Sequence, residues 1–292
     1  MMNVIYFSTV QNVNPMAAVE KKGEEYVILC WNIDGLREEV WAWMKPFLEL
    51  NKPHILCLNE TKKPLDILNA YFNQLKDYVA LISVHTPPHN HGVAILVRKD
   101  VKWNPINFEL GCLTRSDNKC GDPSAGRILA IQVEGQFNIV NTYVPNSGSN
   151  VDAPLKNLGY RVNVWDPALQ NLLNRLDAWK PTIWIGDINV APTDLDATQP
   201  DPGSEAAGFT KLEKQSFNKF MESGRWVDIW REQHPTEPGY TFRGYGAAGQ
   251  IRWRLDNTII SRSLKDRVTD SFTITDCWAR TDHLPFGIRM LK

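Results

Sequence analysis

The chain has 292 residues, of which 43% are hydrophobic and 22% charged, and its formal net charge is −1. This composition is typical of a folded globular protein and excludes a largely disordered or collagen-like chain. Because the charges almost cancel, a nucleic acid could be bound only through a local basic surface.

The first 24 residues predict a loosely ordered tail in front of a single domain that spans residues 25–292. The tail lacks the charged start and long apolar core of a secretory signal, and its acidic residues are atypical of a transit peptide. No run approaches the ~20 apolar residues of a membrane span. We therefore expect an intracellular protein, in the nucleus or in the cytoplasm or nucleoid depending on the organism, with no membrane partner and no obligate protein partner evident.

Short runs rich in β-branched residues recur along the chain, are bounded by polar residues, Gly or Pro, and predict strands. They lie at 26–34, 54–60, 78–84, 92–98, 127–133, 137–144, 182–188, 254–261, 271–278 and 284–290. Helical patterns lie between some of them, at 36–50, 65–76, 166–179 and 211–223. Strands mixed with helices predict an α/β (α+β) protein with a layered sheet and helices outside it.

Polar residues occur at the ends of the predicted strands. If these ends converge, they form one cleft edged by the carboxylates of Asp34, Glu60, Asp187, Asp256 and Asp282. Carboxylate and amide oxygens without cysteine ligands suit a hard cation such as Mg²⁺. The alternative is that each of these residues is an ordinary turn or helix cap.

The pair Asp282-His283 directly precedes the last apolar segment of the chain. A carboxylate beside a buried strand is destabilising unless it is paired or bound to a cation. The pair is therefore either a capping turn or an acid and a base that belong to a site.

Eight motifs carry a resemblance to a known family: WNIDGLR (31–37), LNETK (58–62), NTYVPNSG (141–148), GDINVAPTDLD (186–196), AGFT (207–210), YTF (240–242), WRLDNTIIS (253–261) and TDHLP (281–285). With these motifs in family order, the chain resembles the exonuclease III-type apurinic/apyrimidinic endonucleases of the endonuclease/exonuclease/phosphatase superfamily. The resemblance implies a four-layer β-sandwich of two mixed sheets flanked by helices, with the active site at one loop edge.

The resemblance also implies a Mg²⁺ site, in which we expect Mn²⁺ to substitute. Glu60 corresponds to the main metal ligand, with Asp34 beside it and Asp282 as a further candidate.

The resemblance further implies the catalytic groups of phosphodiester hydrolysis. Asp187 would activate or position the attacking water, and Asn189 would orient it. His283, held in its tautomer by Asp256, would bond the scissile phosphate. Three further residues would support that phosphate: Tyr143, Asn32 and Asn146.

The same resemblance implies the substrate, double-stranded DNA and preferably DNA with an abasic site. Phe242, Trp253 and Leu255 match the apolar wall that accepts a flipped-out sugar without its base; ordinary core packing is the alternative. Segment 241–268 carries six basic residues against two acids, which favours a DNA-backbone surface over a solvated loop. The DNA-binding candidates are Arg37, Lys62, Arg127, Arg243 and Arg252.

These features predict a Mg²⁺-dependent DNA-repair phosphodiesterase that cuts 5′ to abasic sites and leaves a 3′-hydroxyl and a 5′-deoxyribose phosphate, with 3′→5′ exonuclease or 3′-end trimming as an additional activity. One alternative is a related nuclease for undamaged DNA, RNA or a protein–DNA phosphodiester. Departures from the family pattern at Asn257 and in the loop 203–206 leave it open, and further departures are His54 and Asn59. A second alternative is a non-catalytic nucleic-acid-binding scaffold.

Two smaller patterns concern thiols and histidines. The five cysteines include no CxxC pair, which favours buried free thiols, with a Cys112–Cys120 disulfide as the alternative. His85, His89 and His91 could bind a transition metal, but a polar loop near the DNA groove is favoured because no other residue completes such a site.

Overall fold

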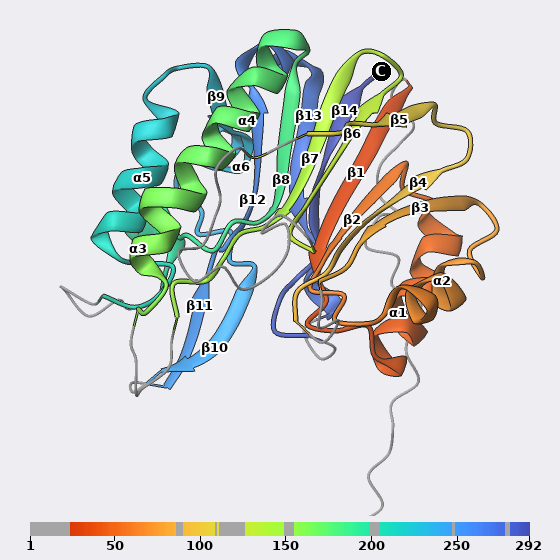
Figure 1. Ribbon diagram of the computed structural model, residues 1–292, viewed down its shortest axis with the longest axis horizontal. Helices are drawn as coiled ribbons and strands as arrows, with labels where there is room; N and C mark the ends of the chain where they lie inside the picture. Colours follow the sequence, from red (N-terminus) through yellow and green to blue (C-terminus); the bar gives the residue numbers. More distant parts are fainter. Residues whose placement is uncertain are drawn as a thin grey trace, which may run out of the picture.

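The computed structural model describes residues 24–85, 90–108, 110, 126–148, 155–198, 205–246, 249–277 and 281–292. Two six-stranded mixed sheets form the centre of the protein (Figure 1). The first sheet has the order β13-β14-β1-β2-β4-β3. Its strands are β1 (Glu25–Asn32), β2 (Ile55–Asn59), β3 (Tyr78–Ser83), β4 (Val93–Arg98), β13 (Val268–Thr273) and β14 (Phe286–Leu291).

The second sheet has the order β5-β6-β7-β8-β12-β9. Its strands are β5 (Trp103–Pro105), β6 (Ile128–Val133), β7 (Phe137–Tyr143), β8 (Thr182–Asp187), β9 (Trp226–Asp228) and β12 (Asp256–Ser261). A separate hairpin pairs β10 (Phe242–Gly246) with β11 (Gly249–Trp253) and projects from one end of the sandwich (Figure 1).

The two sheets pack face to face because alternate strand residues are apolar on the shared side. Ile28 and Cys30 of β1 belong to the same buried cluster as Ile183 and Ile185 of β8. The intervening residues of the same strands face outward, so that Leu29 packs with the helices of the first sheet. Both faces of each sheet are therefore buried over much of their area.

Helices cover the outer faces (Figure 1). α1 (Glu38–Asn51) and α2 (Leu65–Phe72) pack on the first sheet through a cluster that includes Val40 and Leu68. α4 (Asp166–Trp179) and α5 (Lys211–Met221) pack on the second. The shorter helices are α3 (Leu158–Tyr160), a π-helical turn (Arg161–Trp165), α6 (Ile229–Gln233) and three 3₁₀ turns (Asp194–Asp196, Arg262–Arg267 and Thr275–Cys277).

The predicted fold class, a sandwich of two mixed sheets with helices outside, is confirmed. The prediction of a strand at 271–278 was wrong at both bounds, because β13 runs from Val268 to Thr273 and a 3₁₀ turn at Thr275–Cys277 follows it. The short strands β5 and β9 and the β10–β11 hairpin were not predicted. The hairpin sequence FRGYGAAGQIRW contains three glycines and lacks the alternation that marks a strand.

Cys30, Cys57 and Cys277 are buried, as predicted. Cys112 and Cys120 lie outside the described residues, as do residues 1–23 of the predicted tail, so these predictions and the domain boundary stay predictions. Among the described helices, none is long and apolar enough to cross a membrane.

Candidate active site

The polar strand ends converge at one edge of the sandwich. β1 and β2 run parallel with Asn32 opposite Asn59, and β7 and β8 run parallel with Tyr143 opposite Asp187. Asp256 begins β12 directly opposite Asp187. Parallel partners end at the same edge of a sheet, so the strand pairing itself gathers these side chains.

Asn59 joins the two sheets beneath this edge. Its side-chain oxygen accepts a hydrogen bond from the backbone N–H of Asp187 at 2.9 Å, and its amide donates to Asn141 Oδ1 at 2.8 Å. Asn141 in turn donates to the carbonyls of Leu58 and Ala94, both at 3.1 Å. Asn59 and Asn141 are fully buried, so these bonds hold the end of β8 at a fixed distance from β2.

His283 and Asp256 form a buried acid–histidine pair. The Nδ1 atom of His283 lies 2.6 Å from Asp256 Oδ2, which also accepts a hydrogen bond from Thr241 Oγ1 at 2.7 Å. The charge and hydrogen bond of Asp256 outweigh the burial that opposes them and raise the pKa of His283. The pair therefore favours an imidazolium whose Nε2–H points away from Asp256 and can donate to an anion.

Asp187 lies on the other side of this histidine, with its Oδ2 atom 4.0 Å from His283 Nε2. The same oxygen accepts a hydrogen bond from Asn32 at 2.9 Å, and Oδ1 accepts one from the backbone N–H of Asn189 at 3.0 Å. Burial and the nearby charge of Asp256 raise the pKa of Asp187. A carboxylate with a raised pKa takes a proton from water more readily than an ordinary aspartate does.

Asp34 and Glu60 form the acidic side of the site. Both have positive φ angles, 42° and 54°, and such backbone strain in non-glycine residues concentrates at functional sites. Asn32 donates to Glu60 Oε1 at 2.9 Å, in addition to its bond with Asp187. One amide thus links the predicted metal ligand to the predicted base.

The ammonium of Lys62 lies against both carboxylates. It is 2.7 Å from Asp34 Oδ1 and also forms an ion pair with Glu60. Although burial opposes the shift, these contacts and Arg37 lower the pKa of Asp34. Because a single cation contacts both carboxylates, the two are close enough to share one, and their oxygen donors suit a divalent ion.

Among the described residues, a second cluster of acidic side chains lies near Asp34 and Glu60. Asp187, Asp256 and His283 each offer a ligand atom within 4.8 Å of the others, and this acid–histidine cluster could hold a metal ion. Asp282, the third predicted metal ligand, is exposed, and its Oδ1 atom lies 3.3 Å from Thr281 Oγ1. Its predicted role stays a prediction.

Tyr143 and Arg127 border the site near Glu60. Burial and the Glu60 carboxylate raise the pKa of Tyr143 well above its usual value, so that its neutral phenol donates a hydrogen bond to Glu60. The Arg127 guanidinium lies over the Tyr143 ring at 4.9 Å and bonds His91. Burial and Arg127 lower the pKa of His91 to about 3, which keeps its ring neutral. His91 thus supports Arg127, whereas His89 lies outside the described residues.

Asn146 and Asn189 are held together at the end of β7 and β8. Asn146 Nδ2 donates to Asn189 Oδ1 at 3.0 Å, and Asn189 Nδ2 donates to the Val144 carbonyl at 2.9 Å. Asn189 has a φ of 48°, another positive value at this edge. Both side chains are therefore held in place by hydrogen bonds within the protein.

Arg161 was missed by the sequence analysis. It is 3% exposed and donates to the carbonyls of Pro145, Ile188 and Asn189 at 2.7–3.2 Å while it pairs with Asp166. It therefore ties together the two loops that carry Asn146 and Asn189. Thr241, which bonds Asp256, was missed as well; its position inside the quoted YTF motif was the available signal.

The predicted sugar pocket is apolar, but two of its three residues are largely covered. Trp253 and Leu255 are 6% and 5% exposed and pack with Phe209. Phe242 is half-buried, and its ring centroid lies 5.0 Å from that of His283. The apolar group is thus adjacent to the acid–histidine pair, and its role as a sugar pocket stays a prediction.

The predicted DNA-binding residues differ in exposure. Arg252 is exposed, on the hairpin, and Arg243 of the same hairpin is half-buried. Arg37 is half-buried and pairs with Asp34 at 3.1 Å. Lys62 and Arg127, by contrast, are already engaged with Glu60 and Tyr143.

Comparisons with known proteins identify the family of this chain. Residues 29–277 match the model of the endonuclease/exonuclease/phosphatase family. A DNA-(apurinic or apyrimidinic site) endonuclease of Dictyostelium discoideum is 35% identical over 89% of this chain and 69% of its own. The DNA repair nuclease APEX1 of Danio rerio is 31% identical over 89% of this chain and 81% of its own.

Solved structures give the same result. An AP endonuclease from Leishmania major is 28% identical, with a TM-score of 0.77 over 92% of this chain and 88% of its own. An AP endonuclease from Archaeoglobus fulgidus is 27% identical, with a TM-score of 0.72 over 90% of this chain and 98% of its own. The family predicted from the eight motifs is confirmed, and the chain belongs to the endonuclease/exonuclease/phosphatase family.

Proposed function

We propose that the protein is a DNA-repair phosphodiesterase that requires Mg²⁺ and cuts the backbone of double-stranded DNA 5′ to an abasic site. The observation that carries this proposal is the placement of Asp187 and the His283–Asp256 pair on one buried edge, 4.0 Å apart and next to Glu60. Relatives named as abasic-site endonucleases and DNA repair nucleases support the choice of DNA as substrate.

The arrangement supports in-line attack of water on a phosphodiester. Asp187, with its raised pKa, takes the proton of the water, and Asn189 orients that water. His283 donates from Nε2 to a phosphate oxygen, while Asn32, Asn146 and Tyr143 provide further hydrogen bonds near it. A Mg²⁺ ion bound through Glu60 and Asp34, with Asp282 as a further ligand, would stabilise developing negative charge. Mn²⁺ would substitute, because it accepts the same oxygen ligands.

Products with a 3′-hydroxyl and a 5′-deoxyribose phosphate follow if the bond broken is the one on the 5′ side of the lesion. The half-buried Phe242, beside His283, supports a site whose apolar wall accepts a sugar without its base. The basic residues Arg243 and Arg252 of the hairpin would contact the DNA backbone. Trimming of 3′ ends is a second reaction of the same groups, and a relative from Bacillus subtilis, 28% identical over 88% of this chain, is named an exodeoxyribonuclease.

The test compares two end-labelled duplexes, one with a single tetrahydrofuran abasic analogue and one intact, each with Mg²⁺ and with EDTA. A single Mg²⁺-dependent cut directly 5′ of the analogue is expected. Equal cleavage of both duplexes, or a ladder from the 3′ ends alone, would instead support a related nuclease for undamaged substrates. The burial of Trp253 and Leu255 favours this alternative, because it leaves little of the predicted sugar pocket exposed. Binding without cleavage would support a scaffold.

A further inference from the structure

Glu213 is a buried carboxylate that the proposed reaction does not use. It lies in the first turn of α5, is 1% exposed, and one of its oxygens is 3.8 Å from the Arg161 guanidinium. A buried carboxylate is destabilising unless hydrogen bonds satisfy its oxygens. The donors that satisfy Glu213 therefore indicate what this side chain holds in place.

The donors to Glu213 come from two separate loops. Its Oε2 atom accepts from the backbone N–H and the hydroxyl of Thr210, at 3.1 and 2.7 Å, which is the ordinary capping box of a helix. Glu213 also accepts from the backbone N–H of Gly208, at 2.9 Å, and from the hydroxyl of Ser147. A capping box needs neither of these two further bonds.

Ser147 and Gly208 each lie beside one of the two paired asparagines of the site. Ser147 directly follows Asn146, whose amide donates to Asn189 Oδ1 at 3.0 Å. The carbonyl of Gly208 accepts from the N–H of Ala191, two residues after Asn189, at 2.7 Å. Gly208 approaches this loop so closely that a Cβ atom in its place would lie 3.4 Å from the Asn189 carbonyl oxygen. One carboxylate thus joins the loop that carries Asn146 to the loop that carries Asn189.

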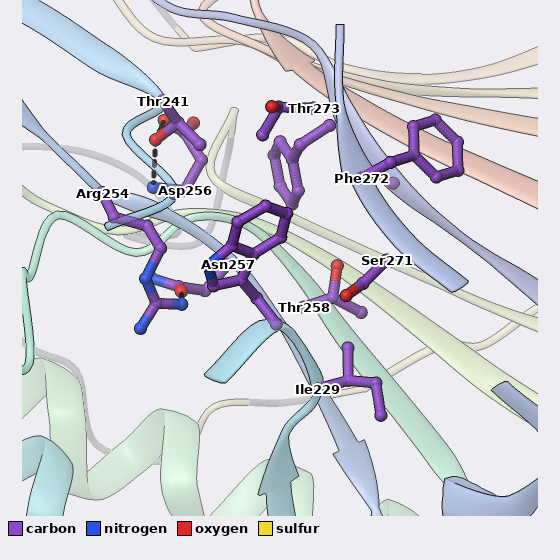
Figure 2. Close-up of a pocket in the computed structure, with 13 residues that line it drawn as sticks. Ile229, Thr241, Arg254, Asp256, Asn257, Thr258, Ser271, Phe272 and Thr273 are labelled. Atoms are coloured by element: carbon purple, nitrogen blue, oxygen red, sulfur yellow. Dashed lines mark hydrogen bonds between the residues drawn. The ribbon is translucent and has the colours of Figure 1, made fainter. Parts of the chain in front are cut away.

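The acid–histidine side of the site has a comparable support. Thr241 lies beside Asp256 (Figure 2) and donates to its carboxylate at 2.7 Å. The same hydroxyl oxygen accepts from the backbone N–H groups of Leu255 and Asp256, at 3.2 and 3.1 Å. One buried side chain therefore fixes the start of β12, and Glu213 has the corresponding place beneath the two asparagine loops.

We propose that Glu213 is a positioning residue that sets the relative position of the Asn146 and Asn189 side chains. Ser147 and Gly208 bond the same carboxylate, so the two loops cannot shift apart without breaking one of these bonds. The inference rests on the proposed roles of Asn146 and Asn189 at the phosphate and the attacking water.

Ser147→Ala removes one of these two bonds and leaves the cap of α5 intact. We expect kcat on the abasic duplex to fall about fivefold, the effect of one ordinary hydrogen bond. KM should stay within about twofold, because Ser147 is fully buried and no variant atom touches DNA.

Two substitutions of Glu213 test the carboxylate itself. In Glu213→Gln the amide oxygen can accept from Gly208 and Thr210, while the amide nitrogen donates to the Ser147 hydroxyl, which can accept as well as donate. Glu213→Met has a similar size and keeps none of these bonds. We expect kcat to stay within about twofold in Glu213→Gln and to fall about tenfold in Glu213→Met, since small displacements of catalytic groups slow the reaction strongly.

Phe217→Leu is the control for a general loosening of α5, because Phe217 lies one turn further along the helix and packs in the core. The folded variant should keep its kcat. The side-chain amide signals of Asn146 and Asn189 in ¹H–¹⁵N NMR spectra provide a readout that needs no substrate. These signals should shift in Glu213→Met and stay in place in Phe217→Leu.

Full turnover and unshifted amide signals in Ser147→Ala and Glu213→Met would show that Glu213 only caps α5, which would overturn the positioning role. Equal losses of kcat in Glu213→Met and in Glu213→Gln or Phe217→Leu would also overturn it, because hydrogen bonds to the two loops would then not account for the effect. Failure of the proposed function is a different result, in which the wild-type protein itself does not cleave the abasic duplex.

Discussion

The side-chain oxygen of Asn59 accepts a hydrogen bond from the backbone N–H of Asp187 at 2.9 Å, although the two residues are 128 positions apart and lie in different sheets. The same side chain donates to Asn141 of the second sheet. A single buried amide therefore fixes the position of the proposed base relative to the strand that leads into Glu60. The separation of the proposed catalytic groups is therefore set inside the core of the sandwich.

Replacing Asn59 with the nearly isosteric Leu tests this connection. The variant leaves the Asp187 N–H and the Asn141 oxygen buried without partners, each at a cost of about 1–3 kcal/mol. We expect the free energy of unfolding in urea to fall by about 3 kcal/mol. The matched control is Gln74→Leu, which removes an exposed amide bonded to the Ala70 carbonyl and should change stability by less than about 0.5 kcal/mol. Similar losses in both variants would contradict the role of Asn59.

Substitution of Asp187 separates catalysis from binding. Asp187→Asn keeps the size of the side chain but removes the carboxylate proposed to take a proton from water, so we expect kcat on the abasic duplex to fall by about 10³-fold or more. Duplex affinity, measured by fluorescence anisotropy, should stay within a few-fold. The control Asp270→Asn removes a partly exposed carboxylate 3.9 Å from Arg289 and should leave kcat unchanged. Full turnover by Asp187→Asn would exclude Asp187 as the base.

The convergence of Asn32, Glu60 and Asp187 could be predicted from the sequence because each lies at the end of an apolar run. Asp256 was included although it lies inside the predicted strand 254–261; in the structure it is the first residue of β12. Parallel neighbours end at the same edge of a sheet, and an antiparallel neighbour begins at that edge. Polar residues at these strand ends therefore lie close together. The eight motifs then assigned roles to these positions. This part of the site is determined locally, by where each strand begins or ends.

The partners of these residues could not be predicted in the same way. Thr241 bonds Asp256 across 15 positions, and Arg161 reaches three carbonyls on two other loops. Such contacts depend on how separate elements pack, for which a single sequence has no periodic signal. Lys62 is a similar case: its charge suggested contact with DNA, but its neighbours in space are two carboxylates.

Because of His54, we expect the folded protein to lose stability in mild acid. It is 9% exposed, and its Nδ1 atom accepts a hydrogen bond from the Val27 N–H at 3.0 Å. Burial, followed by the charges of Arg98 and Lys292, lowers its pKa to about 4, against the partial opposition of Asp100. The unfolded chain, with a histidine pKa near 6.5, therefore binds this proton first as the pH falls, and stability is lost below about pH 6.5.

Urea unfolding of the wild type and of His54→Asn at pH 7 and pH 5 measures this effect. Asparagine can accept the same hydrogen bond through its side-chain oxygen but does not titrate. The wild type should lose about 2 kcal/mol more than the variant between the two pH values. Equal losses would show that His54 is not held neutral in the folded state.

Lys62 and the metal would compete for the same carboxylates. Because the ammonium contacts both Asp34 and Glu60, we expect Lys62→Met to lower the Mg²⁺ concentration for half-maximal cleavage by about tenfold. Glu60→Ala should raise that concentration and recover part of its activity at high Mg²⁺. Lys63→Met is the control, since Lys63 pairs with no carboxylate in the described part of the chain. A higher KM for DNA in Lys62→Met, with unchanged Mg²⁺ dependence, would favour direct contact between Lys62 and DNA.

Arg161 couples stability to the geometry of the site. Arg161→Met removes the ion pair with Asp166, which keeps only its hydrogen bond from Ser216, and takes the donor away from three buried carbonyls. Breaking a buried ion pair costs about 3–5 kcal/mol. We expect a loss of this size in urea unfolding. The control Lys45→Met removes an exposed pair with Glu49 and should cost less than about 1 kcal/mol.

The same variant should affect turnover, because the loops that Arg161 joins carry Asn146 and Asn189. Under conditions where Arg161→Met is still folded, we expect kcat on the abasic duplex to fall about tenfold, since small displacements of catalytic groups slow the reaction strongly. If stability falls and kcat does not, the asparagines are held in place by their own hydrogen bonds, and Arg161 serves only the fold.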